Sequence, residues 1–469
     1  MQTPDANDLN ALLERQRAAW RANVPTPAQR LRDLGALREV LRRRFDELSA
    51  AMSADFGRRS AHESLLTDGM TVLHEIDNMR RHLTRWTRSR HRLADWLFWP
   101  ARTEVQYRPL GVVGVISPWN YPVNLALIPL VSAIAAGNHV MLKPSEHTPR
   151  TSALLRDLLA EVFPEERVAT VIGDAGVAAD FASLPFDHLF FTGSTAVGRK
   201  VMAAAAPNLT PVTLELGGKS PAIIAPDYPI EIAAARIAAG KFLNAGQTCI
   251  APDYVLLPRA RVDTFVDALG AYVARHYPGL RESPDYSSIV NDSHYKRLQA
   301  LAEQARAAGA EVRTFPDAAA HDPERRIFAP TVIVDPPAHL NVMQEEIFGP
   351  VLPVIGYEHI EEAIEFVNAR PRPLAFYHFD RDRARTRGVL AATLAGGVTV
   401  NDCVLHIAQG NLPFGGVGPS GMGHYHGHAG FLTFSKQMPV MYQSRWSSMA
   451  LMRPPYGKLA DFLVKFLTR

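Results

Sequence analysis

The chain has 469 residues, of which 47% are hydrophobic and 21% charged, so it can bury the cores of two or three globular domains. Its net charge of +3 and its lack of a basic stripe with interleaved aromatic residues exclude a typical nucleic-acid-binding protein. Its two cysteines exclude a disulfide framework and favour a reducing compartment.

The N-terminal part of the chain is predicted to be helical. Residues 1–8 lack the basic and apolar regions of a signal peptide, so with the low cysteine content we expect a cytoplasmic protein. Residues 8–95 have the pattern of amphipathic helices rich in Arg and Leu, without a strand pattern. The arginine-rich stretch 80–92 is predicted to be a solvated helix face rather than a binding patch.

From residue 112 onward, short apolar runs alternate with helical segments. The predicted strands are 112–116, 139–142, 168–172, 188–191 and 212–216. The predicted helices are 122–136, 149–163, 175–183 and 195–206. Gly137 is placed to cap the first helix, whose apolar stretch is too short to span a bilayer and is broken by Pro129. This alternation indicates a parallel, doubly wound sheet that binds its ligand at the carboxyl ends of the strands.

The alternation restarts after Gly218 and predicts a second α/β domain. Its predicted strands are 221–225, 253–257, 310–315, 327–334, 351–356, 373–379 and 397–401. No low-complexity linker separates the two halves, so the boundary near residue 217 is expected to be a hinge. Near the C-terminus, residues 459–467 put apolar side chains on one helical face. We expect this helix to pack on its own chain or on a partner subunit, and a membrane surface is the alternative.

Three short motifs suggest a phosphate or metal site but lack its context. Gly416–Gly421 fits the glycine pattern of a dinucleotide loop, yet it follows no βαβ start and contains Pro419, so we predict a turn-rich loop. Residues 193–200 almost fit a nucleotide-hydrolase loop, but Arg199 stands where lysine is needed. The histidines of 424–428 alternate without a cysteine or carboxylate cluster, so we predict a structural loop and no metal site.

Cys249 is the most informative single residue. It lies in the run Asn244–Asp253, a small polar loop after a helical stretch. A polar loop near a base would help its thiol to ionise and act as a nucleophile. Most lone cysteines are buried and inert, so the residue alone leaves both interpretations open.

Several independent motifs follow one another in a fixed order. They are Ser117-Pro-Trp-Asn-Tyr-Pro122, Leu142-Lys-Pro-Ser-Glu146, Phe191-Thr-Gly-Ser-Thr195, Thr213-Leu-Glu-Leu-Gly-Gly-Lys219, the Cys249 loop and Glu345-Glu-Ile-Phe-Gly-Pro350. This order and spacing, from about residue 10 to about residue 445, resembles the aldehyde dehydrogenase superfamily.

The resemblance implies an α/β fold with two doubly wound, Rossmann-like parallel-sheet domains and a small β element for bridging and oligomerisation. The expected parts are an NAD-binding domain at 1–95 and 111–216, a catalytic domain at 217–400, a bridging element at 96–110 and 401–445, and a C-terminal tail at 446–469. Glu104–Arg108 and Leu432–Met441 resemble the bridging element, which in this family pairs with a second subunit. We therefore expect a homodimer.

The resemblance also implies NAD(P)-dependent oxidation of an aldehyde to a carboxylic acid. Cys249 would attack the aldehyde carbon to form a thiohemiacetal, and the Asn120 side-chain amide with the Cys249 backbone N–H would hold its oxygen. After hydride transfer, Glu215 would activate the water that hydrolyses the thioester. Without the resemblance, Asn120 would be interpreted as a turn residue and Glu215 as a capping or pairing group.

Two other functions are compatible with parts of this motif pattern. A dehydrogenase that passes its acyl group to coenzyme A, or a reductase that starts from an activated acid, needs no base for water, so Glu215 argues against both. A member retained only as a structural or nucleotide-binding protein should have lost a catalytic residue, whereas Asn120, Glu215 and Cys249 are all present.

Cofactor contacts are implied in the same way. Lys143 and Glu146 match the positions that bind the adenosine ribose, and Ser194, after Gly193 at a helix start, would contact the pyrophosphate. Two further positions match the contact with the nicotinamide ribose, Glu346 and Phe348. A carboxylate at Glu146 repels a 2′-phosphate and favours NAD, although some relatives with the same motif accept NADP as well.

The substrate class is implied by three stretches. Residues 249–253 and 412–423 resemble the class 3 and fatty-aldehyde branch, whose members are typically dimers. Residues 424–435 resemble bacterial coniferyl aldehyde dehydrogenases, which implies an aromatic propenal of the coniferaldehyde type, with Tyr121 as an aromatic wall. A medium- or long-chain fatty aldehyde is the alternative substrate.

Overall fold

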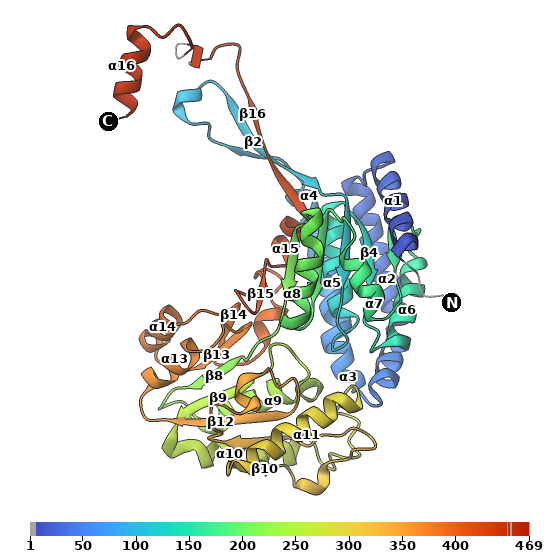
Figure 1. Ribbon diagram of the computed structural model, residues 1–469, viewed down its shortest axis with the longest axis vertical. Helices are drawn as coiled ribbons and strands as arrows, with labels where there is room; N and C mark the ends of the chain where they lie inside the picture. Colours follow the sequence, from blue (N-terminus) through green and yellow to red (C-terminus); the bar gives the residue numbers. More distant parts are fainter. Residues whose placement is uncertain (1–5, 448, 451–452, 469) are drawn as a thin grey trace.

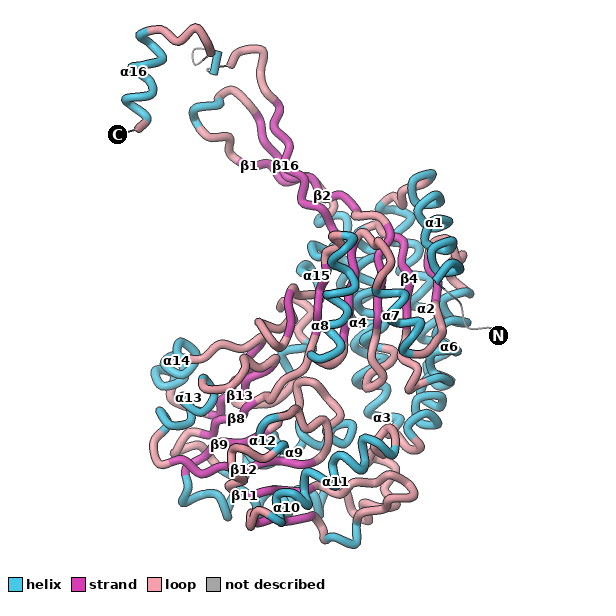
Figure 2. The backbone as a smooth tube through the Cα atoms, viewed as in Figure 1, coloured by secondary structure: helices cyan, strands magenta, loops and turns pink. Residues whose placement is uncertain are grey.

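The computed structural model describes residues 6–447, 449–450 and 453–468. These residues form two bodies, each built around a sheet, and an arm that projects from the first body (Figure 1). In both bodies the strands run through the interior between helices and loops (Figure 2). The two sheet-centred bodies and the β element agree with the predicted fold class, while the exact domain boundaries stay a prediction.

The first body contains a six-stranded sheet with the order β15-β7-β6-β3-β4-β5. Its strands are β3 (Val112–Ile116), β4 (His139–Lys143), β5 (Val168–Thr170), β6 (His188–Thr192), β7 (Val212–Glu215) and β15 (Gly421–Met422). β3 to β7 run parallel, which confirms the five strands predicted there. β15, which was not predicted, adds antiparallel to β7 and sets Gly421 opposite Glu215.

Helices cover both faces of this sheet, so its strands are buried (Figure 1). They are α1 (Ala6–Ala22), α2 (Pro27–Phe56), α3 (Ala61–Ser64), the π-helix η1 (Leu65–Met70), α4 (Thr71–Trp86), α5 (Asn124–Ala136), α6 (Pro149–Ala160), α7 (Ala175–Ala182) and α8 (Thr195–Ala205). Every residue of α5 is buried, and Gly137 ends this helix in the left-handed conformation as predicted. None of the helices in the described part of the chain is long and apolar enough to cross a membrane.

The second body contains a seven-stranded sheet with the order β10-β11-β12-β9-β8-β13-β14. Its strands are β8 (Pro221–Ile224), β9 (Tyr254–Pro258), β10 (Glu311–Thr314), β11 (Thr331–Val334), β12 (Val351–Tyr357), β13 (Ala375–Phe379) and β14 (Gly397–Val400). Its helices are α9 (Ile230–Phe242), α10 (Val262–His276), α11 (Asp292–Ala307), α12 (Asn341–Gln344), α13 (Ile360–Asn368) and α14 (Arg383–Ala392). All seven predicted strands are confirmed, and only the edge strand β10 is antiparallel to its neighbour.

The arm is a three-stranded antiparallel sheet with the order β1-β2-β16. Its strands are β1 (Arg90–Arg92), β2 (Arg102–Pro109) and β16 (Ser435–Tyr442). α15 (Gly427–Thr433) leads into β16, and α16 (Lys458–Leu467) lies beyond it, apart from both bodies (Figure 1). The expectation of no strand within 8–95 is wrong at β1, because this short strand is fixed by its pairing with β2.

Single turns of 3-10 helix complete the described structure. They are η2 (Trp96–Phe98), η3 (Ala206–Asn208), η4 (Leu243–Gly246), η5 (Arg259–Arg261), η6 (Ala318–Ala320) and η7 (Leu405–Ala408). Residues 416–420 form a turn as predicted, whereas Gly421 belongs to β15 because it pairs with Glu215. The loop predicted for 424–428 is confirmed only for 424–426, because Gly427 and His428 begin α15.

Candidate active site

The parallel strands of the first sheet bring four predicted site residues to one edge. Lys143 ends β4, Glu215 ends β7, Asn120 follows β3, and Ser194 follows β6. The carboxyl ends of parallel strands lie at the same edge of a sheet, where doubly wound folds bind their ligands. The predicted catalytic and cofactor residues of the first body therefore share one edge.

Asn120 and Cys249 are brought together although they belong to different bodies. The Asn120 Nδ2 donates a hydrogen bond to the Gln247 carbonyl at 3.1 Å, two residues before Cys249. The hydroxyls of the next residues along the two loops, Tyr121 and Thr248, are 2.5 Å apart. The amide nitrogen of Asn120 carries two hydrogens, so one stays available for a ligand.

The loop that carries Cys249 is held rigidly. Asn244 has φ 51°, a left-handed conformation that asparagine tolerates better than most residues. The Gln247 side-chain amide donates to the carbonyls of Asn244 and Ser288, both at 3.0 Å, and its oxygen accepts from the Val290 N–H at 2.9 Å. These bonds fix the turn that presents Cys249.

Glu215 is buried without a polar partner. Its side chain is 2% exposed, and neither carboxyl oxygen has a hydrogen-bond partner among the residues that the structure describes. Burial raises the pKa of this carboxyl well above its usual value. Burial of this carboxyl therefore opposes its ionisation.

The thiol of Cys249 is partly exposed yet poorly solvated. Burial first, and then the charges of Glu346 and Glu215, raise its pKa to about 12. The expectation that the loop helps the thiol to ionise is therefore wrong. The physical reasons are that the thiol is poorly solvated and that the nearby Glu346 and Glu215 are acids, whose charge opposes formation of a thiolate.

Glu346 packs against the glycine pair that follows Glu215. A Cβ on Gly217 would lie 2.0 Å from the Glu346 Oε2, so any larger residue there would displace the Glu346 carboxyl. Burial first, and then the charge of Asp253, raise the pKa of Glu346 to about 8. Within the described residues its Oε1 has no hydrogen-bond partner.

Phe348 lies close to the Asn120 loop. Its ring meets that of Trp119 edge to face, with centroids 5.3 Å apart. Trp119 directly precedes Asn120, so Glu346 and Phe348 both border the same site as the catalytic candidates.

The segment that carries Glu346 is anchored by an ion pair that sequence reasoning did not assign. The carboxylate of Asp253 accepts from the Ile347 N–H at 3.1 Å and pairs with the Lys219 ammonium at 2.5 Å. Lys219 also donates to the Glu345 carbonyl at 3.0 Å. Lys219 and Asp253 both lie within the motifs described in the sequence, so their positions could have indicated that they form an ion pair near the site.

The predicted cofactor residues fit a dinucleotide. The Lys143 ammonium is buried and donates to the Glu146 carboxylate at 3.0 Å, while Glu146 reaches solvent. Ser194 is the N-cap of α8, after Gly193, so the free backbone N–H groups of this helix suit a pyrophosphate. The unpartnered carboxyl oxygen of Glu346 offers an acceptor to a hydroxyl.

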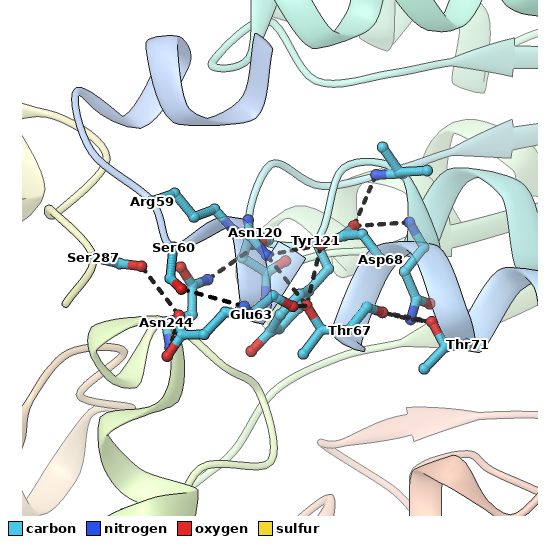
Figure 3. Close-up of polar contacts among 12 residues, drawn as sticks. Arg59, Ser60, Glu63, Thr67, Asp68, Thr71, Asn120, Tyr121, Asn244 and Ser287 are labelled. Carbon is cyan, nitrogen blue, oxygen red and sulfur yellow. Dashed lines mark hydrogen bonds and ion pairs between the residues drawn. The ribbon is translucent and has the colours of Figure 1, made fainter. Parts of the chain in front are cut away.

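A second buried ion pair, Arg59–Asp68, fixes the backbone at Asn120 (Figure 3). The sequence analysis did not identify it. The Arg59 guanidinium donates to the Asn120 carbonyl and to the Asp68 carboxylate, each at 2.7 Å. The other Asp68 oxygen accepts from the N–H groups of Val123 and Asn124 at 3.1 and 3.0 Å, which caps the start of α5. Both side chains are fully buried, so this pair fixes the backbone on either side of Tyr121.

Glu63 extends the same network to the nucleophile loop (Figure 3). Its carboxyl accepts from the Asn244 N–H at 3.1 Å and from the Ser287 hydroxyl at 3.2 Å. Burial raises its pKa to about 7. No sequence pattern separates Arg59, Glu63 and Asp68 from the many surface charges of the helical N-terminal segment, because their role depends on distant partners.

A cavity of about 200 Å³ adjoins this network between α4, α5 and η7. Its lining includes Thr71, Glu75, Asn124, Ile128, Ile407 and His426. Two of these lining residues are bonded to each other, because the Asn124 Nδ2 donates to the Thr71 hydroxyl at 2.8 Å.

Comparison with known sequences identifies the chain's relatives. The family model described as "Aldehyde dehydrogenase family" matches residues 1–440. A probable coniferyl aldehyde dehydrogenase of Pseudomonas aeruginosa is 51% identical over 98% of this chain and 96% of its own. A coniferyl aldehyde dehydrogenase of a Pseudomonas species is 45% identical over 98% of this chain and 96% of its own.

Solved structures agree with this result. Staphylococcus aureus AldH in a substrate-bound state superposes with a TM-score of 0.92 at 35% identity, covering 98% of this chain and 99% of that one. An aldehyde dehydrogenase of Mycobacterium tuberculosis in complex with NAD⁺ gives a TM-score of 0.85 at 28% identity, covering 95% and 92%.

Proposed function

The chain belongs to the aldehyde dehydrogenase family, and on this premise we propose that it oxidises an aromatic aldehyde of the coniferaldehyde type to the carboxylic acid. As a family member it is an NAD(P)-dependent oxidoreductase that acts on aldehydes. The observation that carries the proposed chemistry is the bond from Asn120 to the Gln247 carbonyl, which sets an amide donor beside Cys249. A straight-chain aldehyde is less favoured, because the relatives named for coniferyl aldehyde are the more similar ones.

Cys249 is the nucleophile of the proposed reaction. Its sulfur bonds to the aldehyde carbon, and the carbonyl electron pair moves to oxygen, giving a thiohemiacetal. The free N–H of the Asn120 amide and the Cys249 backbone N–H donate to this oxygen. The thiol proton leaves as the bond forms: the ionised carboxyl of Glu215 accepts it and releases it to solvent before the second half of the reaction, so the carboxylate is restored.

Glu215 is the base of the second half of the reaction. A nicotinamide cofactor, when bound, would supply the hydride acceptor for the conversion of the thiohemiacetal into a thioester. Glu215 then takes a proton from a water molecule whose oxygen attacks the thioester carbon. The C–S bond breaks, the carboxylic acid leaves, and the sulfur takes up the proton that Glu215 removed from water, which restores the Cys249 thiol.

The cofactor is held by residues of both bodies. Lys143 and Glu146 bind the adenosine ribose, and the N-terminus of α8 at Ser194 binds the pyrophosphate. Glu346 and Phe348 border the nicotinamide ribose. The Glu146 carboxylate repels a 2′-phosphate, so NAD is preferred over NADP.

The protein is proposed to act as a cytoplasmic homodimer. The arm supports the dimer, because β1 and β16 are the edge strands of its sheet and edge strands offer unpaired backbone groups to another chain.

An aldehyde panel followed at 340 nm with NAD and NADP tests the proposal. We expect kcat/KM for coniferaldehyde to exceed the values for hexanal and decanal, with NAD as the better cofactor. A preference of more than about tenfold for either alkanal would move the protein to straight-chain aldehydes.

A further inference from the structure

The cavity between α4, α5 and η7 has one polar side. Apolar side chains such as Ile128 and Ile407 line part of it, whereas Glu75, Asn124 and His426 face it with polar groups. A cavity of about 200 Å³ is large enough for a substituted benzene ring, since an engineered cavity of about 150 Å³ binds benzene. The cavity therefore suits an aromatic ring that carries a polar substituent.

Two residues that line the cavity, His426 and Asn124, each have a side-chain atom without a hydrogen-bond partner within the described part of the chain. His426 is 6% exposed, and its atom without such a partner is Nε2. Burial first, and then the neighbouring His406, lower its pKa to about 3, so the ring is neutral. A neutral imidazole has one nitrogen that accepts a hydrogen bond, and buried polar atoms without a partner are rare in native structures.

Glu75 fixes the position of His426. Its carboxyl accepts from the Gly427 N–H at 2.7 Å, directly after His426. Gly427 has φ 50°, and a Cβ there would overlap the Gly410 carbonyl, so this turn has little freedom to move. Glu75 thus acts on the histidine through the backbone.

The polar side of the cavity is close to the reaction centre. Tyr425 directly precedes His426 and is fully buried. Asn124 lines the cavity, and its backbone N–H donates to the Asp68 carboxylate at 3.0 Å, whose partner Arg59 donates to the Asn120 carbonyl at 2.7 Å. A flat substrate whose aldehyde reaches Cys249 can therefore place its ring beside His426.

We propose, building on the proposed function, that His426 recognises the ring hydroxyl of 4-hydroxylated aromatic aldehydes. The phenolic O–H donates to the Nε2 of His426, and Glu75 is the positioning residue that holds this histidine in place. The site then selects hydroxylated propenals over the unsubstituted ones.

The test compares kcat/KM for 4-hydroxycinnamaldehyde, cinnamaldehyde and 4-methoxycinnamaldehyde, which differ only at this position. We expect the wild-type enzyme to prefer the hydroxylated compound to each of the others by at least about tenfold, because the methoxy compound cannot donate. His426→Phe should bring the ratio of hydroxylated to unsubstituted substrate close to one. His426→Gln, which keeps an acceptor, should restore part of it.

His428→Phe is the matched control, because His428 packs on Trp86 and Phe431 and is not among the residues that line the cavity. This variant should keep the wild-type ratio. Glu75→Gln should lower the ratio less than His426→Phe does, since the acceptor nitrogen of His426 remains and only its position changes through the Gly427 backbone.

The outcomes separate the two proposals. Equal kcat/KM for hydroxylated and unsubstituted propenals in the wild type, with both above decanal, would overturn the hydroxyl site and leave the aromatic function standing. An unchanged ratio in His426→Phe would overturn the role of His426. Decanal above all three propenals would overturn the proposed function and the hydroxyl site together.

Discussion

At the scale of single residues, the two cysteines provide an internal control for the chemistry. Cys249→Ser should abolish dehydrogenase turnover and leave NAD binding and the melting temperature near wild type, because a serine hydroxyl is too weak a nucleophile here. Cys403 is buried in the core, so Cys403→Ser should lower the melting temperature and retain turnover. Steady-state rates at 340 nm and NAD titration measure both effects. Turnover near wild type in Cys249→Ser would remove it as the nucleophile.

The role of Glu215 as the base predicts how the rate of deacylation depends on pH. Only its ionised form can take a proton from water, and burial raises its pKa, so the rate of deacylation should increase as the pH rises through that raised value. Glu215→Gln should give a pre-steady-state burst of NADH followed by slow turnover without this pH dependence. Stopped-flow traces between pH 6 and pH 10 measure it. A steady-state rate equal to that of the wild type would exclude Glu215 as the base.

The residue scale also shows which parts of the site could be predicted. Cys249, Glu215 and Asn120 stand in local motifs, so their identity could be predicted before their geometry was known. The raised pKa of the Cys249 thiol could not be predicted from the sequence, because it depends on burial within the folded protein and on Glu346 from a distant segment. Arg59 and Asp68 escaped prediction because nothing near them in the sequence marks an ion pair as buried.

At the scale of elements, α3 is predicted to link stability to pH through Glu63. Its folded-state pKa of about 7 exceeds the ordinary 4.5, so the folded protein binds the proton more tightly than the unfolded chain. The stability that the folded protein gains from protonated Glu63 is complete below pH 4.5, and it is lost as the pH rises towards 7. Relative to Glu63→Gln, the wild type should lose up to about 3 kcal/mol over this range.

Urea unfolding at several pH values measures this difference. Glu39→Gln is the control, because the Glu39 side chain is 60% exposed and should show no such pH-dependent difference. A difference between wild type and Glu63→Gln that stays constant from pH 4.5 to pH 8 would contradict the buried link between α3 and the Asn244 loop.

The elements that could be predicted are those with a strong pattern of their own. The parallel strands β3 and β8 are continuous apolar runs because both faces of their sheets are covered. β1 and β15 have three and two residues, too few to show a period, and only their partners β2 and β7 make them strands. Pairing across the fold, rather than local propensity, decided the elements that were missed.

At the scale of the whole molecule, the site exists only where the two bodies meet. Glu215 ends the last parallel strand of the first sheet, and Gly217 and Gly218 lead directly into β8 of the second. At this junction the Glu346 carboxyl of the second body packs against Gly217, and the Leu216 N–H donates to the Ser420 carbonyl, in the turn that precedes β15. A small rotation between the bodies would therefore change the surroundings of Glu215 and Glu346 together.

The arm and α16 make the last prediction. α16 stands apart from both bodies, so the expectation that it packs on the body of its own chain is not met, and Leu459, Phe462 and Phe466 remain exposed (Figure 1). An apolar helical face at the tip of an arm suits a contact with a second copy of the chain, so we favour packing on a partner subunit.

Replacing Phe462 and Phe466 by Asp should weaken dimerisation at least about tenfold in analytical ultracentrifugation. The reason is that burial of each aromatic side chain contributes more than about 1.4 kcal/mol to the free energy of association. Lys458→Ala is the control on the same helix. Co-sedimentation of the wild type with anionic vesicles, lost in the double variant while the dimer persists, would assign α16 to a membrane surface instead.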